Sequence, residues 1–323
     1  MSNSATGREI WTGSVFRILF GNYAELKLDI DPDTLTPLAS DLLPSGITDQ
    51  IAGRDYYRRI IRTLEDAGGF TRGEPGVAAH PDEKRYYVFK YDWRQDIVEN
   101  ARHLDAYIEQ IRKDFDDPNL RVDIVAHSLG GLITRYYARY GTVDVLDDNL
   151  FPVNNHGAER IRRVVLLGTP SLGSIEAIKV IIEGHPVGLR KMPPQTVVTF
   201  PSVYQVLPHP INIWLVNAEG ERVQQDLFDV TFWQRFQLSV FDPNVIERIK
   251  KQYDTPEEGQ RRVELLQRYF AKYIERARRF VWSLTVPADE LPIRYILFGG
   301  DCYLTLARVL LEDIGGVSIL QFD

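Results

Sequence analysis

One stretch decides the fold of this chain: Arg121-Val-Asp-Ile-Val-Ala-His-Ser-Leu-Gly-Gly-Leu-Ile-Thr-Arg-Tyr-Tyr137. It begins with an apolar, β-branched run, and after Ser128 the apolar residues recur at helical spacing. The pattern predicts a strand, a sharp turn and a helix, with Ser128 at the turn. A serine held in this way, at the end of a sheet and beside a helix N-terminus, forms a nucleophile elbow. The alternative is a turn that only links a strand to a helix; the flanking strand and helix favour the nucleophile.

The residues two positions before and two positions after Ser128 are both small. A strand and a helix that meet at so tight a turn approach each other too closely for larger side chains. The chain has Ala126 and Gly130 there, so it departs from the pattern Gly-x-Ser-x-Gly by one methyl group. We expect the geometry to tolerate that methyl group.

The composition is that of a globular protein. Hydrophobic residues make up 44% and charged residues 26% of the 323 residues, which suits one large α/β domain with an insertion. The net charge of -7 argues against binding of nucleic acid by the whole molecule. The single cysteine, Cys302, excludes an internal disulfide and fits a reducing compartment, so we expect a cytoplasmic protein. The sequence contains neither a signal peptide pattern nor the run of roughly 18 apolar residues that a transmembrane helix needs.

The segments around the elbow predict a parallel sheet. Residues 86 to 91 form an apolar, aromatic run that we expect to be a buried strand, and residues 96 to 114 have the periodicity of a helix. Residues 162 to 168 contain a third strand, whose near-continuous apolar run predicts cover on both faces. Successive strand and helix units imply right-handed crossovers and a parallel sheet. We expect another core strand at residues 293 to 300 and a last strand or hairpin arm at 317 to 320.

The chain changes character after the third strand and its helix. Six prolines between residues 186 and 210 prevent long regular elements, and residues 214 to 223 have the pattern of a hairpin. A long helix is expected to follow from Thr255, a good N-cap, with Pro256 at the first helical position. Its apolar residues recur at spacings of three and four as far as Leu284.

These patterns predict three parts. Residues 1–184 are the first part of the core, residues 185–290 are a cap inserted over the active edge of the sheet, and residues 291–323 are the returning core strand. The C-terminal part of the core is expected to be missing from this last segment.

Two segments have patterns typical of contact with lipid. Trp11 to Phe20 places apolar residues on one helical face. The predicted long helix carries a basic face, which consists of Arg261, Arg262, Arg268, Lys272, Arg276, Arg278 and Arg279. Transient contact with a membrane surface is one expectation for both. The alternatives, which the patterns favour, are a first segment packed on the core and a basic face that is simply solvated.

Four motifs occur in order along the chain: Tyr91-Asp92-Trp93-Arg94, Ala126 to Gly131, Leu167 to Ser174, and Phe200 to Pro208. Together they resemble the lecithin:cholesterol acyltransferase family of α/β-hydrolases. This family includes phospholipid:diacylglycerol acyltransferases, lysosomal phospholipase A2 and bacterial relatives. The order and spacing of the motifs follow the family over nearly the whole chain.

The resemblance implies a three-layer α/β-hydrolase fold, with a mostly parallel sheet and an inserted cap, and acyl chemistry on lipid esters. Ser128 is the expected nucleophile, which takes an acyl group and passes it to water or to an alcohol. The backbone N–H of Leu129 is expected to be one donor of the oxyanion hole. The expected partner is a lipid or another ester substrate, and no nucleic acid. The six histidines have no ligand spacing, so we expect no metal, and we expect no cofactor.

The chain departs from the family at both ends. Family members begin with a strand whose turn supplies the second oxyanion donor, and they end with an acid followed by a histidine. We expect that donor before Met1, and the acid and the histidine beyond Asp323. Asp301 also follows a strand, but its position matches the strand that precedes the acid turn, so it is a weak candidate for the acid.

The histidines within the chain are poor candidates for the base. His127 is next to Ser128, but we expect it to pack under the turn, because adjacent side chains at an elbow point in different directions. His156, His185 and His209 are in predicted loops, and we expect them at the surface.

Three functions remain open from the sequence. The first is a serine-dependent lipid acyl hydrolase or O-acyltransferase that works through an acyl-serine at Ser128. The second is a non-catalytic module of the same fold that binds a lipid or a protein partner. The third is an esterase for small soluble esters.

Overall fold

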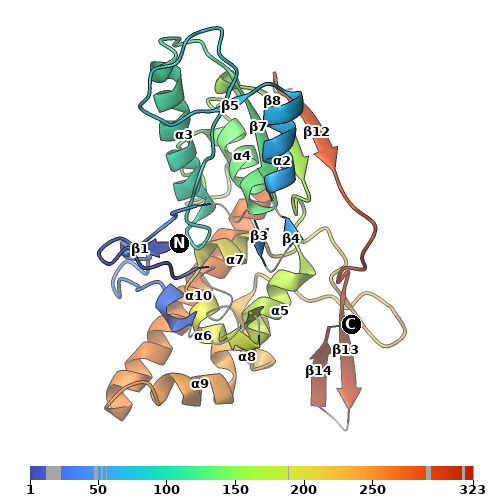
Figure 1. Cartoon of the computed structure of the whole chain (residues 1–323). Coiled ribbons are helices and arrows are strands. Elements are labelled where there is room, and N and C mark those ends of the chain that lie inside the picture. The colour runs from blue at the N-terminus through green and yellow to red at the C-terminus, as the bar shows by residue number, and fades with distance from the viewer. Residues whose placement is uncertain are drawn as a thin grey trace.

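The computed structural model describes residues 1–11, 23–46, 50–51, 54–55, 57–187, 189–288, 292–314 and 317–322 (Figure 1). The predicted helical face from Trp11 to Phe20 therefore lies outside the described residues, except for Trp11. The longer elements that build the core are α3 (Ile97–Asp114), β7 (Val122–His127), α4 (Leu129–Tyr140), β8 (Ile161–Leu167), α5 (Ile175–Glu183) and β12 (Arg294–Phe298). The short helices near them are η1 (Tyr23–Leu26), α2 (Arg58–Arg62), η2 (Thr63–Ala67) and η3 (Ala158–Arg160).

The central sheet has the strand order β12-β8-β7. Both pairs are parallel, with Val165 opposite Val125 on one side and Ile296 on the other. Helix α4 follows β7 directly and α5 follows β8 after a short loop, so the carboxyl ends of the strands and the N-termini of these helices share one edge. The prediction of a parallel sheet around Ser128 is confirmed.

Helices lie on both sides of β7. A Cβ atom built on Gly130 of α4 would lie 3.9 Å from the Cβ of Ala126, so Ala126 faces α4. His127, the next residue, contacts Tyr57 at the start of α2. Because side chains alternate along a strand, α4 and its neighbour α3 pack on one face, and α2 lies on the side of the other face, near the carboxyl end of β7. The result is the three-layer α/β arrangement (Figure 1).

The predicted strand at residues 86 to 91 is largely wrong. Only β6 (Arg85–Tyr86) is a strand there, and it pairs in parallel with β5 (Thr71–Arg72). Tyr87, Val88, Phe89 and Tyr91 line a cavity beside β7. They form no β-bridge with β7. A strand needs a neighbouring strand for its hydrogen bonds, and none of the described residues provides one at this point.

The face of the sheet toward α2 is less covered than the sequence predicts. Asp123, Val125 and His127 are exposed, whereas Ala126 on the other face is buried. In β8, Val164 and Leu166 are buried while Val165 and Leu167 are half-buried. The expectation of a third strand covered on both faces is therefore only half met.

Short elements fill residues 185 to 250, as the prolines predict. They are β9 (His185–Val187), β10 (Arg190–Met192), α6 (Pro194–Val197), α7 (Pro201–Gln205), β11 (Leu215–Val216), α8 (Val230–Arg235), η4 (Ser239–Phe241) and α9 (Pro243–Lys250). The predicted hairpin after β11 is present, since Val223 N–H donates to the Leu215 carbonyl over 3.0 Å.

The long helix is α10 (Pro256–Ser283), and the Thr255 hydroxyl accepts from Glu258 N–H over 3.2 Å, as expected for its N-cap. Its buried side chains belong to the same hydrophobic core as those of α3 and α4. In Figure 1, α10 runs from the centre of the molecule down to α9. Nothing in this arrangement separates the predicted cap from the core, and the boundaries of the three predicted parts stay a prediction.

The last described strands form a hairpin. β13 (Val309–Ile314) pairs antiparallel with β14 (Val317–Gln321), and β11 pairs in parallel with β13. This small sheet is separate from the central one. The remaining strands are short pairs: β1 (Ser2–Asn3) with β2 (Leu42–Leu43), and β3 (Gln50–Ile51) with β4 (Arg54–Asp55).

Candidate active site

Ser128 has a backbone conformation that few side-chain-bearing residues adopt, with φ 50° and ψ -122°. Such conformations cost on the order of 1–3 kcal/mol and persist where the surroundings enforce them, often at functional sites. Here Ser128 N–H donates to the Leu167 carbonyl of β8 over 3.0 Å, and the Ser128 carbonyl accepts from Gly131 N–H over 3.0 Å. The serine is thus held between a sheet strand and the first turn of α4, in the geometry of a nucleophile elbow.

The glycine that the elbow requires is Gly131. A Cβ atom there would lie 2.0 Å from Thr169 Oγ1 and 2.5 Å from Thr169 Cγ2. A Cβ on Gly130 would meet nothing closer than Tyr91 Oη at 3.6 Å. The sequence pattern predicted that a side chain larger than hydrogen would not fit at Gly130. In the structure the severe clash would occur at Gly131, where α4 passes the loop that follows β8. The methyl group of Ala126 is accommodated, as expected.

Leu129 is the first residue of α4. The first N–H groups of a helix have no carbonyl within the helix to bind, and they carry the positive end of the helix dipole. The Leu129 N–H is therefore suited to an oxyanion formed at Ser128, but its role stays a prediction. We identify no second backbone donor for this position among the described residues.

No described histidine forms a hydrogen bond with Ser128. His127 does not pack under the turn as predicted: it is exposed on the face of the sheet toward α2, and its Nδ1 lies 3.0 Å from Tyr57 Oη. Partial burial lowers the pKa of His127 and raises that of Tyr57. At neutral pH this pair is therefore uncharged.

Two of the other histidines considered as bases, His156 and His209, have partners elsewhere. His156 Nε2 lies 3.2 Å from Asp105, beside α3. His209 was predicted at the surface, but it is only 1% exposed. It packs edge-on against Trp282 with ring centroids 4.5 Å apart, and its Nε2 lies 3.0 Å from Thr285 Oγ1. The sequence suggested a loop position but could not show that α10 would cover the loop.

Asp301 lies just after β12 and is exposed, and no described residue forms a hydrogen bond or ion pair with it. Cys302 beside it is a free, exposed thiol. Among the residues that the structure describes, no group of three or more histidine, cysteine, aspartate or glutamate side chains could hold a metal ion.

The loop that follows β8 is tied to the elbow helix. Arg135 of α4 donates to the carbonyls of Ser171 and Leu284 over 3.2 and 3.0 Å. Thr169 in this loop has a buried hydroxyl that forms no hydrogen bond with any described residue. The elbow, the loop after β8 and the end of α10 are therefore fixed relative to one another.

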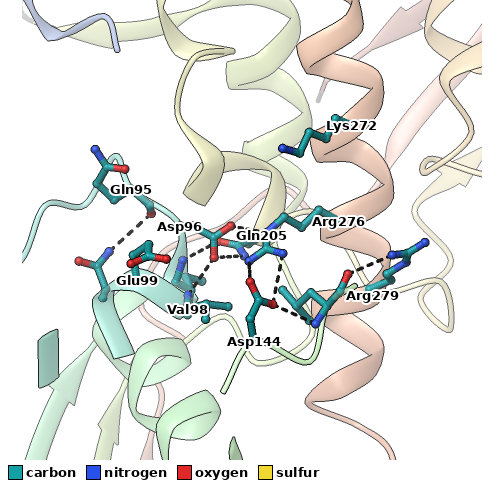
Figure 2. A network of polar contacts seen from close by, with 12 residues as sticks. Gln95, Asp96, Val98, Glu99, Asp144, Gln205, Lys272, Arg276 and Arg279 are labelled. Carbon is teal, nitrogen blue, oxygen red and sulfur yellow. Dashed lines mark hydrogen bonds and ion pairs between the residues drawn. The ribbon is translucent and has the colours of Figure 1, made fainter. Parts of the chain in front are cut away.

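A partly buried ion-pair network connects α10 to the segments on either side of the elbow (Figure 2). Arg276 Nε lies 2.6 Å from Asp96, the N-cap of α3, and Arg276 Nη2 lies 2.7 Å from Asp144, in the loop after α4. Gln205 of α7 donates to Asp96 over 3.1 Å and accepts from Ile97 N–H over 2.8 Å. No sequence pattern predicts this network, because its members are far apart in the chain.

More than half of the basic side chains on the predicted face of α10 contact other residues of the chain. Arg278 pairs with Asp226, Arg279 with Glu275, and Lys272 donates to two backbone carbonyls. With Arg276 buried in its network, four of the seven basic side chains serve internal contacts. Fewer basic side chains of α10 are therefore available to contact a lipid surface than the sequence alone suggested.

The motif Tyr91 to Arg94 organises the N-terminal segment. The Arg94 side chain is fully buried, binds Asp92 through Nε and Nη2 over 2.9 and 2.7 Å, and donates to the Leu26 carbonyl over 2.9 Å. A buried arginine needs partners for its donors, and besides these carbonyl and carboxylate oxygens Ser40 Oγ accepts from Nη2 over 3.0 Å. The motif thus has a structural role next to α3.

Residues 50–255 match the family model described as lecithin:cholesterol acyltransferase, which is more than half of the chain. The chain belongs to the lecithin:cholesterol acyltransferase family. Membership agrees with the elbow geometry and with the parallel sheet, and the fold is that of the α/β-hydrolases. The resemblance carried by the four motifs is confirmed.

Two further comparisons place this family member among known proteins. The uncharacterized protein YJR098C of Saccharomyces cerevisiae is 24% identical over 225 residues, which cover 68% of this chain and 29% of the yeast protein. The chain therefore spans less than a third of that relative. In the crystal structure of the Tle4–Tli4 complex, one chain aligns with 16% identity and a TM-score of 0.44, over 72% of this chain and 48% of that one. Among the described residues, no helix is both long and apolar enough to cross a membrane.

Proposed function

We propose that this member of the lecithin:cholesterol acyltransferase family is a serine-dependent lipid acyl hydrolase or O-acyltransferase, with Ser128 as the nucleophile. The observation that carries the proposal is the strained backbone of Ser128 between β7 and α4, because such strain persists only where the structure enforces it. Ser128 Oγ attacks the ester carbonyl as a general base takes its proton, and the Leu129 N–H stabilises the oxyanion. The C–O bond to the alcohol then breaks, the base returns the proton to the leaving oxygen, and an acyl-serine remains. Water or a second alcohol then takes the acyl group.

The substrate class is part of the proposal. Family membership supports a lipid ester, and a phospholipid is the form we would test first. We also propose a reducing compartment such as the cytoplasm, because the chain has one cysteine.

A non-catalytic module is the second candidate. It is favoured by one observation: no described histidine forms a hydrogen bond with Ser128, whereas a serine hydroxyl needs a general base to become a good nucleophile. On this alternative the elbow keeps its shape and binds a lipid or a protein partner without turnover.

The experiment compares three substrates on the parent chain and on Ser128→Ala. These are phospholipid vesicles, the same vesicles with a long-chain alcohol, and a soluble short-chain p-nitrophenyl ester. The proposal expects release or transfer of the fatty acyl group that disappears in Ser128→Ala. Turnover of the short ester alone would favour a small-ester esterase. Vesicle binding without turnover, equal in both proteins, would favour the non-catalytic module.

A further inference from the structure

A cleft opens between the end of α10 and the segment of residues 208–228. Its volume is about 370 Å³, at the lower end of the range for sites that bind small molecules. Arg278 and Trp282 line it from α10, and Trp214 and Arg222 line it from the segment that contains the hairpin. The cleft shares no lining residue with the cavity beside β7, so the two are separate.

The walls of the cleft are held by contacts within the chain. The Trp214 ring packs edge-on against Phe232, with ring centroids 5.5 Å apart. Arg278 Nη2 donates to the Phe228 carbonyl over 3.0 Å and lies 3.1 Å from Asp226. A site whose walls are fixed before binding loses less conformational entropy when a ligand enters.

Several donors in the cleft have no partner. Trp214 is only 5% exposed, and its indole N–H forms no hydrogen bond with any described residue. A buried indole N–H usually has an acceptor, so this donor marks a place for a ligand atom. The exposed Arg222 side chain forms no ion pair or hydrogen bond with the residues that the structure describes. Arg278 makes its contacts through Nε and Nη2, which leaves Nη1 for a ligand.

The charges in the cleft favour an anion. Two arginines and one aspartate line it, which leaves one net positive charge. Guanidinium groups bind carboxylate and phosphate oxygens through paired N–H donors. Trp282 is 39% exposed and adds an aromatic ring to the same cleft. An occupant that uses both features carries one acidic group and an aromatic or apolar ring.

We propose that this cleft binds a small organic anion, whose carboxylate or phosphate pairs with Arg222 and Arg278. The ring of the ligand lies on Trp282, and one of its oxygens accepts from the Trp214 indole N–H. None of the residues that line the cleft belongs to the elbow, and binding there does not depend on the chemistry of Ser128.

Benzyl phosphate is the probe that contains both parts. Benzyl alcohol has the ring alone, and inorganic phosphate has the anion alone. Each is titrated into the full chain with isotopically labelled tryptophan, and the five indole N–H resonances are followed by NMR. The Trp214 resonance is assigned with Trp214→Phe. Arg222→Gln removes one charge from the cleft, and Arg248→Gln, at an exposed arginine of α9 outside the cleft, is the matched control.

The proposal expects benzyl phosphate to shift the Trp214 resonance and to bind at least about tenfold more tightly than benzyl alcohol or inorganic phosphate. Arg222→Gln should weaken this binding about tenfold, as the loss of a charge-assisted hydrogen bond does, and Arg248→Gln should leave it unchanged. Equal binding of benzyl phosphate and of either part alone would overturn the proposal, because the cleft would then not recognise both features. A Trp214 resonance that stays in place at millimolar benzyl phosphate, or an equal loss of binding in the two arginine variants, would overturn it too.

Discussion

Replacing Arg276 by methionine should destabilise the protein by about 3 kcal/mol. The guanidinium connects α10 to Asp96 and Asp144, and its side chain is 15% exposed, against 8% for Asp96 and 24% for Asp144 (Figure 2). Removing one partner of a buried ion pair typically costs about 3–5 kcal/mol, because the remaining charge is left buried. We take the lower end, because Asp144 keeps some contact with water and Asp96 keeps its bonds to Val98 N–H and Gln205.

The assay is urea unfolding followed by tryptophan fluorescence, with the midpoint compared at unchanged slope. Arg268→Met is the matched control, since Arg268 is an exposed arginine on the same helix, and it should change stability by no more than about 0.5 kcal/mol. Asp144→Asn leaves the bond to Asp96 and should cost about 1–2 kcal/mol. If Arg276→Met were no more harmful than Arg268→Met, the inference that this network fixes α10 to the core would be wrong.

Two further predictions concern the elbow and a buried histidine. Gly131→Ala should destabilise the protein by about 1–3 kcal/mol, because the added methyl group clashes with Thr169. Gly130→Ala should be neutral or slightly stabilising, because the added methyl group has room and alanine favours the helix. Thermal unfolding of both variants measures this difference, and equal effects would contradict the steric argument. Burial lowers the pKa of His209, so the unfolded chain binds more protons and the free energy of unfolding falls as the pH drops below about 6.5. His209→Gln should make urea midpoints between pH 7 and pH 5 less pH-dependent than in the parent, and an unchanged slope would count against this.

Local patterns predicted what depends on local structure. The strand, turn and helix around Ser128, the N-cap at Thr255 and the long helix after it all follow from side-chain spacing within one segment, and the structure contains them. The elbow was predictable because the tight turn restricts which residues fit within a few positions of the serine.

Features that depend on distant partners were not predictable. Residues 87 to 91 have the composition of a strand, but no described neighbour offers them a ladder of hydrogen bonds. His209 is buried because α10 crosses its loop, and Arg276 turns inward because two aspartates more than a hundred residues away accept its bonds. Apolar periodicity located the buried face of α10, but it assigned Arg276 to the solvated one.

The most direct test of the central claim is the intact mass of the chain after reaction with a fluorophosphonate. The claim is that Ser128 is an activated nucleophile, so the parent should gain one adduct and Ser128→Ala none. A folded parent chain that gains no adduct, or an adduct that persists in Ser128→Ala, would contradict it.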